Sequence, residues 1–121
     1  MTFEKFAAIA AAHRPDAVVQ AHGTFGGVAD VAICFRRPDG NESRVYHYRG
    51  SYAAILNQLG IKVVTASGLS TAEEQLRLAR ASHGKPGLFS KGQPEDRSRE
   101  IERLTALIAQ YNSDEYIRDW E

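Results

Sequence analysis

The first half of the chain changes from a helical to an alternating pattern of apolar and polar positions. Over residues 2–13 apolar side chains recur at helical spacing and Thr2 stands where an N-cap is expected, so this segment is predicted to be a helix. Arg14-Pro15 ends it, because the residue before a proline avoids the helical region. From residue 17 onwards apolar and polar residues alternate, which is typical of strands with one buried face.

Turn residues divide the alternating region into three predicted strands. Gly26-Gly27 permits a tight reversal, and Pro38-Asp39-Gly40-Asn41 is a strong turn signal. Strands joined by short turns must pair antiparallel. The predicted strands are 17–25, 29–36 and 43–49.

The second half of the chain returns mainly to helical periodicity. Ser51 is expected to cap a helix that Gly60 closes, and Ser70-Thr71-Ala72-Glu73 matches a capping box. The expected elements are a helix to residue 59, an edge strand at 62–65, a helix at 70–82, a loop at 84–93, a helix at 94–111 and one further helical turn within 114–121.

These elements predict an α+β fold of order α-β-β-β-α-β-α-α. An antiparallel meander of three to four strands would be packed with helices, and the C-terminal part from about residue 70 to 121 would be helical. A chain of 121 residues fits one domain, so 1–121 is expected to form a single α+β domain.

The alternation also predicts a register for the meander. An odd-length first loop, 26–28, would place residue 21 opposite 33 and residue 22 opposite 32. A four-residue second loop would pair residue 33 with 46 and residue 31 with 48. Val19, Ala21 and Phe25 would then lie in the apolar phase of the first strand, and Tyr46 and Tyr48 would face the core with Val31 and Ile33.

The opposite face of this predicted sheet is the first candidate site. His22 and His47 would flank Ala32, and Asp30 would lie opposite Arg49. A histidine could then act as a general base, Arg49 could bind an anion, and Asp30 could orient one of them. The histidines, about 9–10 Å apart across two strand spacings, are too far apart to share a metal ion. The alternative is a half-solvated or helix-covered face with a routine Asp30–Arg49 pair.

A basic segment from residue 77 to 91 is the second candidate site. It lacks acidic residues, and its glycines expose backbone amides. We expect it to be a docking surface for phosphate, nucleic acid or an acidic protein. The alternative is that its cations stabilise the end of a helix and that Phe89 is buried. The candidate partner-binding residues are Arg77, Arg80, His83, Lys85, Phe89 and Lys91.

Composition narrows the classes of function. Fifteen basic residues balance fifteen acidic ones, which argues against a general nucleic-acid coat or a polybasic membrane anchor. Cys34 is the only cysteine, so neither an internal disulfide nor a multi-cysteine metal site can form. The chain carries no nucleotide-binding or catalytic motif, so we expect no cofactor and no metal. Its start has neither the basic residues nor the apolar length of a signal peptide, which favours the cytoplasm.

The sequence therefore favours a small, non-enzymatic accessory or regulatory protein. It would bind a macromolecular partner, protein or nucleic acid, through the basic loop and the C-terminal helices, and it would not enter a membrane. One alternative is a small-ligand-binding or enzymatic domain that uses the polar sheet face. Another is a homo-oligomer subunit with Tyr116 and Trp120 at its interface.

Overall fold

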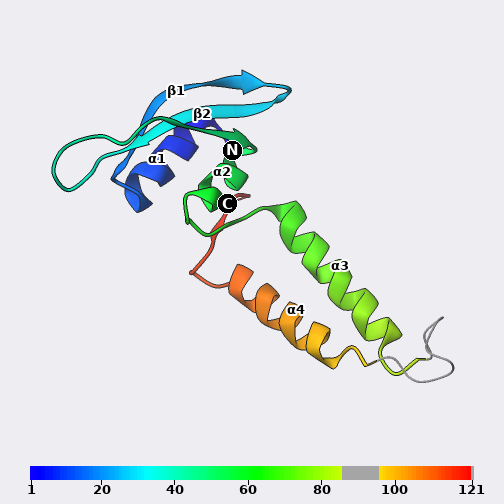
Figure 1. The fold of residues 1–121 in the computed structure, drawn as a ribbon. Coiled ribbons are helices and arrows are strands. Elements are labelled where there is room, and N and C mark those ends of the chain that lie inside the picture. The colour runs from blue at the N-terminus through cyan, green and yellow to red at the C-terminus, as the bar shows by residue number, and fades with distance from the viewer. Residues whose placement is uncertain (86–95, 121) are drawn as a thin grey trace. The chain divides into compact units, whose positions relative to one another are not determined.

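The computed structural model describes residues 1–85 and 96–120 of the chain, which forms two compact units, Met1–Val63 and Val64–Glu121. The predicted α+β class and order of elements are confirmed (Figure 1). None of the helices within these two described stretches is both long and apolar enough to cross a membrane.

The first unit contains a three-stranded antiparallel sheet of order β1-β2-β3. Its strands are β1 (Ala17–Phe25), β2 (Val28–Phe35) and β3 (Tyr46–Gly50). The central strand β2 contributes Val31 and Ile33, which are completely buried. Both side chains point to the face that the helices cover, so one side of the sheet forms the core and the other does not.

Two helices cover this core face, α1 (Phe3–His13) and α2 (Tyr52–Gln58) (Figure 1). Both begin at the predicted caps: the Thr2 hydroxyl accepts a hydrogen bond from the Lys5 amide at 3.2 Å, and the Ser51 hydroxyl accepts one from the Ala54 amide at 3.1 Å. Gly60 closes α2 in the left-handed conformation, with φ at 84°. The completely buried side chains of this unit are Phe6, Val31, Ile33, Ile55 and Leu56.

The register predicted for β1 against β2 is wrong along the whole pair, although the first part of the strand keeps the predicted face. The alternation predicts residue 21 opposite 33, but Val19 pairs with Ile33, Ala21 with Ala32 and His22 with Val31, and the pairing shifts between residues 19 and 21. Gln20 is the extra residue of this β-bulge. Beyond it every side chain of β1 points to the side opposite to the predicted one.

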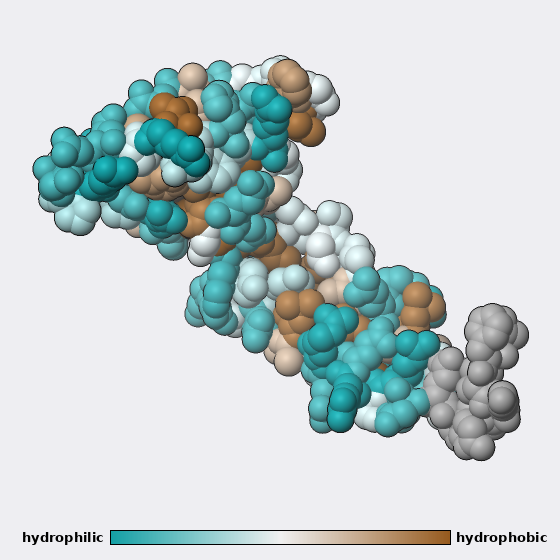
Figure 2. Space-filling view, viewed as in Figure 1, coloured by the Kyte–Doolittle hydropathy of each residue, from teal (hydrophilic) through white to brown (hydrophobic). Residues whose placement is uncertain are grey.

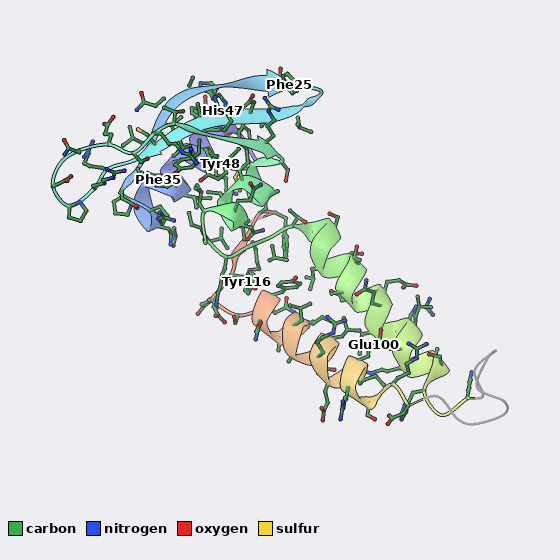
Figure 3. The ribbon with its side chains drawn as sticks, viewed as in Figure 1. Phe25, Phe35, His47, Tyr48, Glu100 and Tyr116 are labelled. Carbon is green, nitrogen blue, oxygen red and sulfur yellow. The ribbon has the colours of Figure 1, made fainter. Side chains whose placement is uncertain are left out.

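The register of β2 against β3 is confirmed throughout. Ile33 pairs with Tyr46, Val31 with Tyr48, and Asp30 with Arg49. Tyr48 is half-buried between the sheet and the helices (Figure 3). Tyr46 lies on the same face near its end, remains 38% exposed and packs on Phe35 with ring centroids 6.0 Å apart. Only one of the two predicted core tyrosines is therefore enclosed.

The second unit is built on two helices, α3 (Ala66–Ser82) and α4 (Ser98–Tyr111), which pack against each other. Their contact is apolar and is made by Leu76, Ala79 and Leu104, with Ile101 and Ile108 packed beside them. The apolar side chains at helical spacing along α4 are thus the ones that α3 covers. Tyr111 continues it by an edge-on contact with Tyr116, at 5.0 Å between ring centroids.

Three predictions for this part of the chain are wrong. Helix α4 begins at Ser98 and not at residue 94. Helix α3 begins four residues before the expected capping box. Thr65 is its N-cap, because the Thr65 hydroxyl accepts a hydrogen bond from the Gly68 amide at 3.0 Å. The tail forms a two-residue strand, β5 (Ile117–Arg118), in place of a helical turn. It pairs with β4 (Val63–Val64), the short strand predicted at 62–65, in a separate two-stranded sheet.

Candidate functional site

The bulge at Gln20 divides the predicted polar face. His22 lies on the helix-covered side, where its ring stacks on Phe3 with centroids 3.7 Å apart and planes 13° from parallel. The expectation that His22 and His47 flank Ala32 on one face is therefore wrong. The same shift moves Ala21 and Phe25 to the face that α1 and α2 leave uncovered, which we call the open sheet face.

The other three predicted residues meet on the open sheet face. One carboxylate oxygen of Asp30 lies 3.3 Å from Nδ1 of His47, and the other accepts a hydrogen bond from Nε of Arg49 at 3.3 Å. The Asp30 side chain is only 19% exposed, whereas His47 and Arg49 remain 61% and 51% exposed. Asp30 thus binds the inner nitrogens of two longer side chains, Nδ1 of His47 and Nε of Arg49, while the outer ends of both side chains reach water.

This arrangement sets the charge state of Asp30. Its partial burial favours the neutral acid, but the hydrogen bonds from His47 and Arg49, together with their positive charge, outweigh burial and lower the pKa of Asp30 below its ordinary value. The carboxylate is therefore ionised wherever the protein is folded near neutral pH. It can act as an acceptor and an anchor but not as a proton donor.

A shallow pocket of about 160 Å³ adjoins this cluster. Its floor is made of small residues, Ala21 and Gly23 of β1 and Ala32 of β2, and Asp30 and His47 line its side; the other bordering residues are His22 and Thr24. Gly23 pairs with Asp30 across the strands, and a Cβ atom built on Gly23 would meet nothing within 4 Å. The absence of a side chain at residue 23 therefore opens the space next to the carboxylate.

An exposed aromatic ring borders the same cluster. Phe25 ends β1 at the tip of the first hairpin and is 57% exposed (Figure 3). The guanidinium of Arg49 lies over its ring, 4.0 Å from the centroid. Val28, the cross-strand partner of Phe25, is 42% exposed. Apolar atoms consequently gather at this tip (Figure 2), directly beside charged groups.

Cys34 lies on the open sheet face but is not available to react. Its side chain is buried, with the Gln20 amide nitrogen 3.0 Å from Sγ and a Glu42 carboxylate oxygen at 3.5 Å. The role of this cysteine is therefore to fill the space under Gln20.

The second predicted site divides into paired and unpaired cations. Arg77 is tied to Glu74 one turn earlier, with Nε donating at 3.0 Å. Arg80 and Lys85 are exposed and form no ion pair with any residue in 1–85 or 96–120. Nδ1 of His83 accepts a hydrogen bond from the backbone amide of Arg97 at 3.0 Å, so this ring joins the two helices. Phe89 and Lys91 lie outside the described residues.

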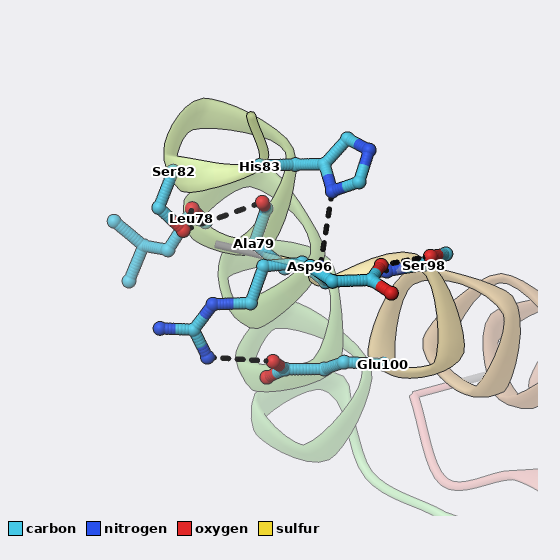
Figure 4. Close-up of polar contacts among 8 residues, drawn as sticks. Leu78, Ala79, Ser82, His83, Asp96, Ser98 and Glu100 are labelled. Atoms are coloured by element: carbon cyan, nitrogen blue, oxygen red, sulfur yellow. Dashed lines mark hydrogen bonds and ion pairs between the residues drawn. The ribbon is translucent and has the colours of Figure 1, made fainter. Parts of the chain in front are cut away.

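A second shallow pocket lies between these two helices. Figure 4 shows the polar contacts of this region, among them the hydrogen bond of His83. Leu78, 52% exposed, borders the pocket on α3, and an Arg97–Glu100 pair at 2.9 Å borders it on α4. Asp96 accepts hydrogen bonds from the amide and hydroxyl of Ser98 at the start of α4, and these bonds lower the pKa of Asp96. Most polar groups here are occupied by hydrogen bonds within one helix or at its end, and the bond between His83 and Arg97 links the two.

Searches against family models, curated proteins and solved structures give no match to this chain.

Three residues of these surfaces were not predicted as functional: Gly23, Phe25 and Leu78. A signal for the first two was present, since Gly26-Gly27 suits a two-residue hairpin turn and would pair Phe25 with Val28. Such a turn places odd-numbered residues of the first strand opposite even-numbered residues of the second. The alternation at residues 17–19 requires odd opposite odd, so the two agree only if the first strand contains one extra residue between residue 19 and the turn. Leu78 lies outside the buried face of α3, but a single exposed leucine is too common to indicate a site.

Proposed function

We propose that this protein is a non-enzymatic binding protein that holds a macromolecular partner on the open sheet face. The observation that carries the proposal is the Asp30–His47–Arg49 cluster, drawn from two strands and bordered by the exposed ring of Phe25. Aromatic residues and arginine are enriched where proteins bind one another, and charged groups beside an apolar rim give such contacts their orientation.

The size of the pocket favours a macromolecule over a small molecule. Sites that enclose small ligands usually have volumes of about 300–1,000 Å³. The pocket beside Asp30 has about 160 Å³ and is open to solvent along the sheet. It can receive one side chain or one planar group of a larger partner, while the partner's remaining surface would rest on Phe25 and Val28.

Binding is also favoured over catalysis by the state of the charged groups. Acid–base and electrostatic catalysis are strongest where water is excluded. His47 is 61% exposed, and the charge of Asp30 is already balanced by Arg49. The same groups are well arranged to recognise a polar group that arrives from outside.

Filling the pocket tests the proposal. Gly23→Leu would place a side chain over the small floor, and its Cβ would meet no atom within 4 Å. We expect the folded protein to capture its partner from the native cell extract less well by about tenfold or more, because the centre of the contact is blocked. Quantitative mass spectrometry of wild-type and variant captures measures this, with thermal unfolding as the check on folding.

Arg37→Gln is the matched control, because Arg37 is exposed in the β2–β3 connection and forms no ion pair within the described part of the chain. It should leave capture unchanged. A partner retained in full by Gly23→Leu would refute the proposed site.

The end of α3 is a second candidate surface for a partner. It is favoured by the exposed cations Arg80 and Lys85, which have no carboxylate partner among residues 1–85 and 96–120, and by the exposed Leu78 on the same helix. The double change Arg80→Gln with Lys85→Gln distinguishes the two surfaces in the same capture experiment. Loss of the partner in this variant, with full retention in Gly23→Leu, would move the site to α3.

A further inference from the structure

The free hydrogen-bonding groups of the cluster indicate what kind of partner group it recognises. Arg49 uses Nε for Asp30, which leaves the edge formed by its two terminal nitrogens without a partner among the described residues. His47 uses Nδ1, so Nε2 is likewise free. The two residues are separated by one position on β3 and project from the same face, about 7 Å apart along the strand.

Arg49 is held in place from two directions. Its plane stacks on the ring of Phe25 at 4.0 Å, and its Nε is tied to Asp30. A guanidinium fixed in this way presents two parallel N–H donors in its own plane, which is the geometry that matches the two oxygens of a carboxylate. The cost of ordering the side chain is met before any ligand arrives.

Resting on the proposed function, we infer that the open sheet face recognises an aspartate or glutamate side chain of a protein partner. The terminal nitrogens of Arg49 would donate to the incoming carboxylate. Nε2 of His47 would donate to it only in the imidazolium form, because Nδ1 already donates to Asp30. Asp30 is then a positioning residue, which holds Arg49 and His47 in place and does not touch the partner's carboxylate.

The charges on this face favour a protein carboxylate over the phosphates of a nucleic acid. Asp30 and Glu42 both contribute negative charge to the open sheet face, where Glu42 reaches Cys34. A polyanion requires a row of unopposed cations, because its affinity comes from neutralising several phosphates. A single carboxylate with apolar neighbours fits one arginine beside Phe25 and Val28.

Nuclear magnetic resonance with short peptides tests this inference. The probes are blocked Ala-Glu-Leu-Ala and blocked Ala-Gln-Leu-Ala, titrated to millimolar concentration into the labelled full-length protein. We expect the glutamate peptide to shift the side-chain resonances of His47 and Arg49, and the glutamine peptide to bind more weakly by roughly tenfold, since one charge-assisted hydrogen-bond pair is lost. Equal binding of both peptides would overturn the inference.

Substitutions separate recognition from simple charge attraction. Arg49→Lys keeps the positive charge but loses the planar pair of donors, so affinity for the glutamate peptide should fall by about tenfold. Arg37→Lys, on the β2–β3 connection, should leave the affinity for the glutamate peptide unchanged.

Asp30→Asn tests the positioning role. It removes a negative charge, which by attraction alone would tighten binding of the peptide; a positioning role predicts weaker binding instead. Tighter binding would overturn the role assigned to Asp30.

Two further probes identify the alternatives. Inorganic phosphate or an oligonucleotide of eight thymidines that shifts His47 and Arg49 at lower concentration than the glutamate peptide would replace the carboxylate by a phosphate ligand. Failure of every probe, with partner capture still lost in Gly23→Leu, would leave the proposed function standing and remove this inference. Retained capture in that variant would remove the proposed function itself.

Discussion

At the scale of single residues, Arg14 holds together parts of the first unit that are distant in sequence. Its Nε and one terminal nitrogen donate to the two carboxylate oxygens of Asp16, each at 3.0 Å, and the other terminal nitrogen donates to the carbonyl of Leu59 at 2.7 Å. Its guanidinium also lies over Phe35, 5.1 Å from the ring centroid. One side chain thereby links the end of α1, the end of α2 and the sheet.

Arg14→Lys is expected to destabilise the protein although it conserves charge. A lysine ammonium cannot make the forked contact with Asp16 and reach Leu59 at the same time, so the free energy of unfolding should fall by about 1–2 kcal/mol. Chemical denaturation followed by circular dichroism measures the change. Arg44→Lys is the control, since Arg44 only stacks on Tyr46 at 4.9 Å. An equal loss in both variants would contradict the role given to Arg14.

At the scale of elements, the first hairpin is defined by its turn. Gly26 and Gly27 have φ values of 59° and 82°, which place both residues in the left-handed region that a two-residue hairpin turn requires. The turn pairs Phe25 with Val28 and so positions the exposed ring beside Arg49. The open sheet face therefore depends on the backbone of this turn as well as on its own side chains.

Gly27→Ala should lower the free energy of unfolding by about 1 kcal/mol, because a Cβ atom disfavours the left-handed conformation. Gly23→Ala is the matched control. Residue 23 lies in the same strand pair outside the left-handed region, and a Cβ there meets no atom within 4 Å. We expect the control to be neutral or slightly stabilising, since glycine weakens a strand interior. Thermal unfolding of the two variants compares them, and equal destabilisation would show that the turn is not special.

The elements also show how far the sequence predicts this protein. Helix caps at Thr2 and Ser51, the left-handed Gly60 and the pairing of β2 with β3 were all predictable, because each follows from a local signal. The site was predicted in part: Asp30, His47 and Arg49 meet, and His22 does not. The error comes from one inserted residue, Gln20, which interrupts the pairing of β1 with β2. Contacts between residues distant in sequence, such as the stacking of Phe3 on His22, offset the free energy lost at this bulge.

At the scale of the whole molecule, several carboxyl groups are more acidic in the folded chain than in the unfolded one. Asp16 has its pKa lowered by hydrogen bonds from Arg14, and Glu74 by those from Arg77. For Asp30 and Asp96 the shift has the same direction. The folded state therefore binds fewer protons than the unfolded state at acid pH, and these groups contribute stability above their unfolded pKa values near 4.

Stability should consequently fall as the pH is lowered from about 5 to about 2, where these carboxylates take up protons. Unfolding midpoints in denaturant across this range, followed by circular dichroism, measure the slope. Asp16→Asn should make the slope shallower, whereas Asp114→Asn should not, because Asp114 makes no hydrogen bond with the described residues. A slope of opposite sign would mean that the lowered pKa values do not govern acid stability.

The inserted Gln20 reverses the alternation of side chains along strand β1. Odd-numbered side chains face the helix-covered side up to Val19, and even-numbered ones do so from His22 onwards. Only the first part of the strand is partly buried, since residues 20–25 are exposed. In a saturation survey of this strand, polar replacement should therefore cost stability at residues 17–19 and be tolerated from residue 20 onwards. Deleting Gln20 would shift the pairing of one segment of β1 by one residue and turn the side chains of that segment to the opposite face of the sheet. A single codon therefore determines which side chains the open sheet face presents to solvent.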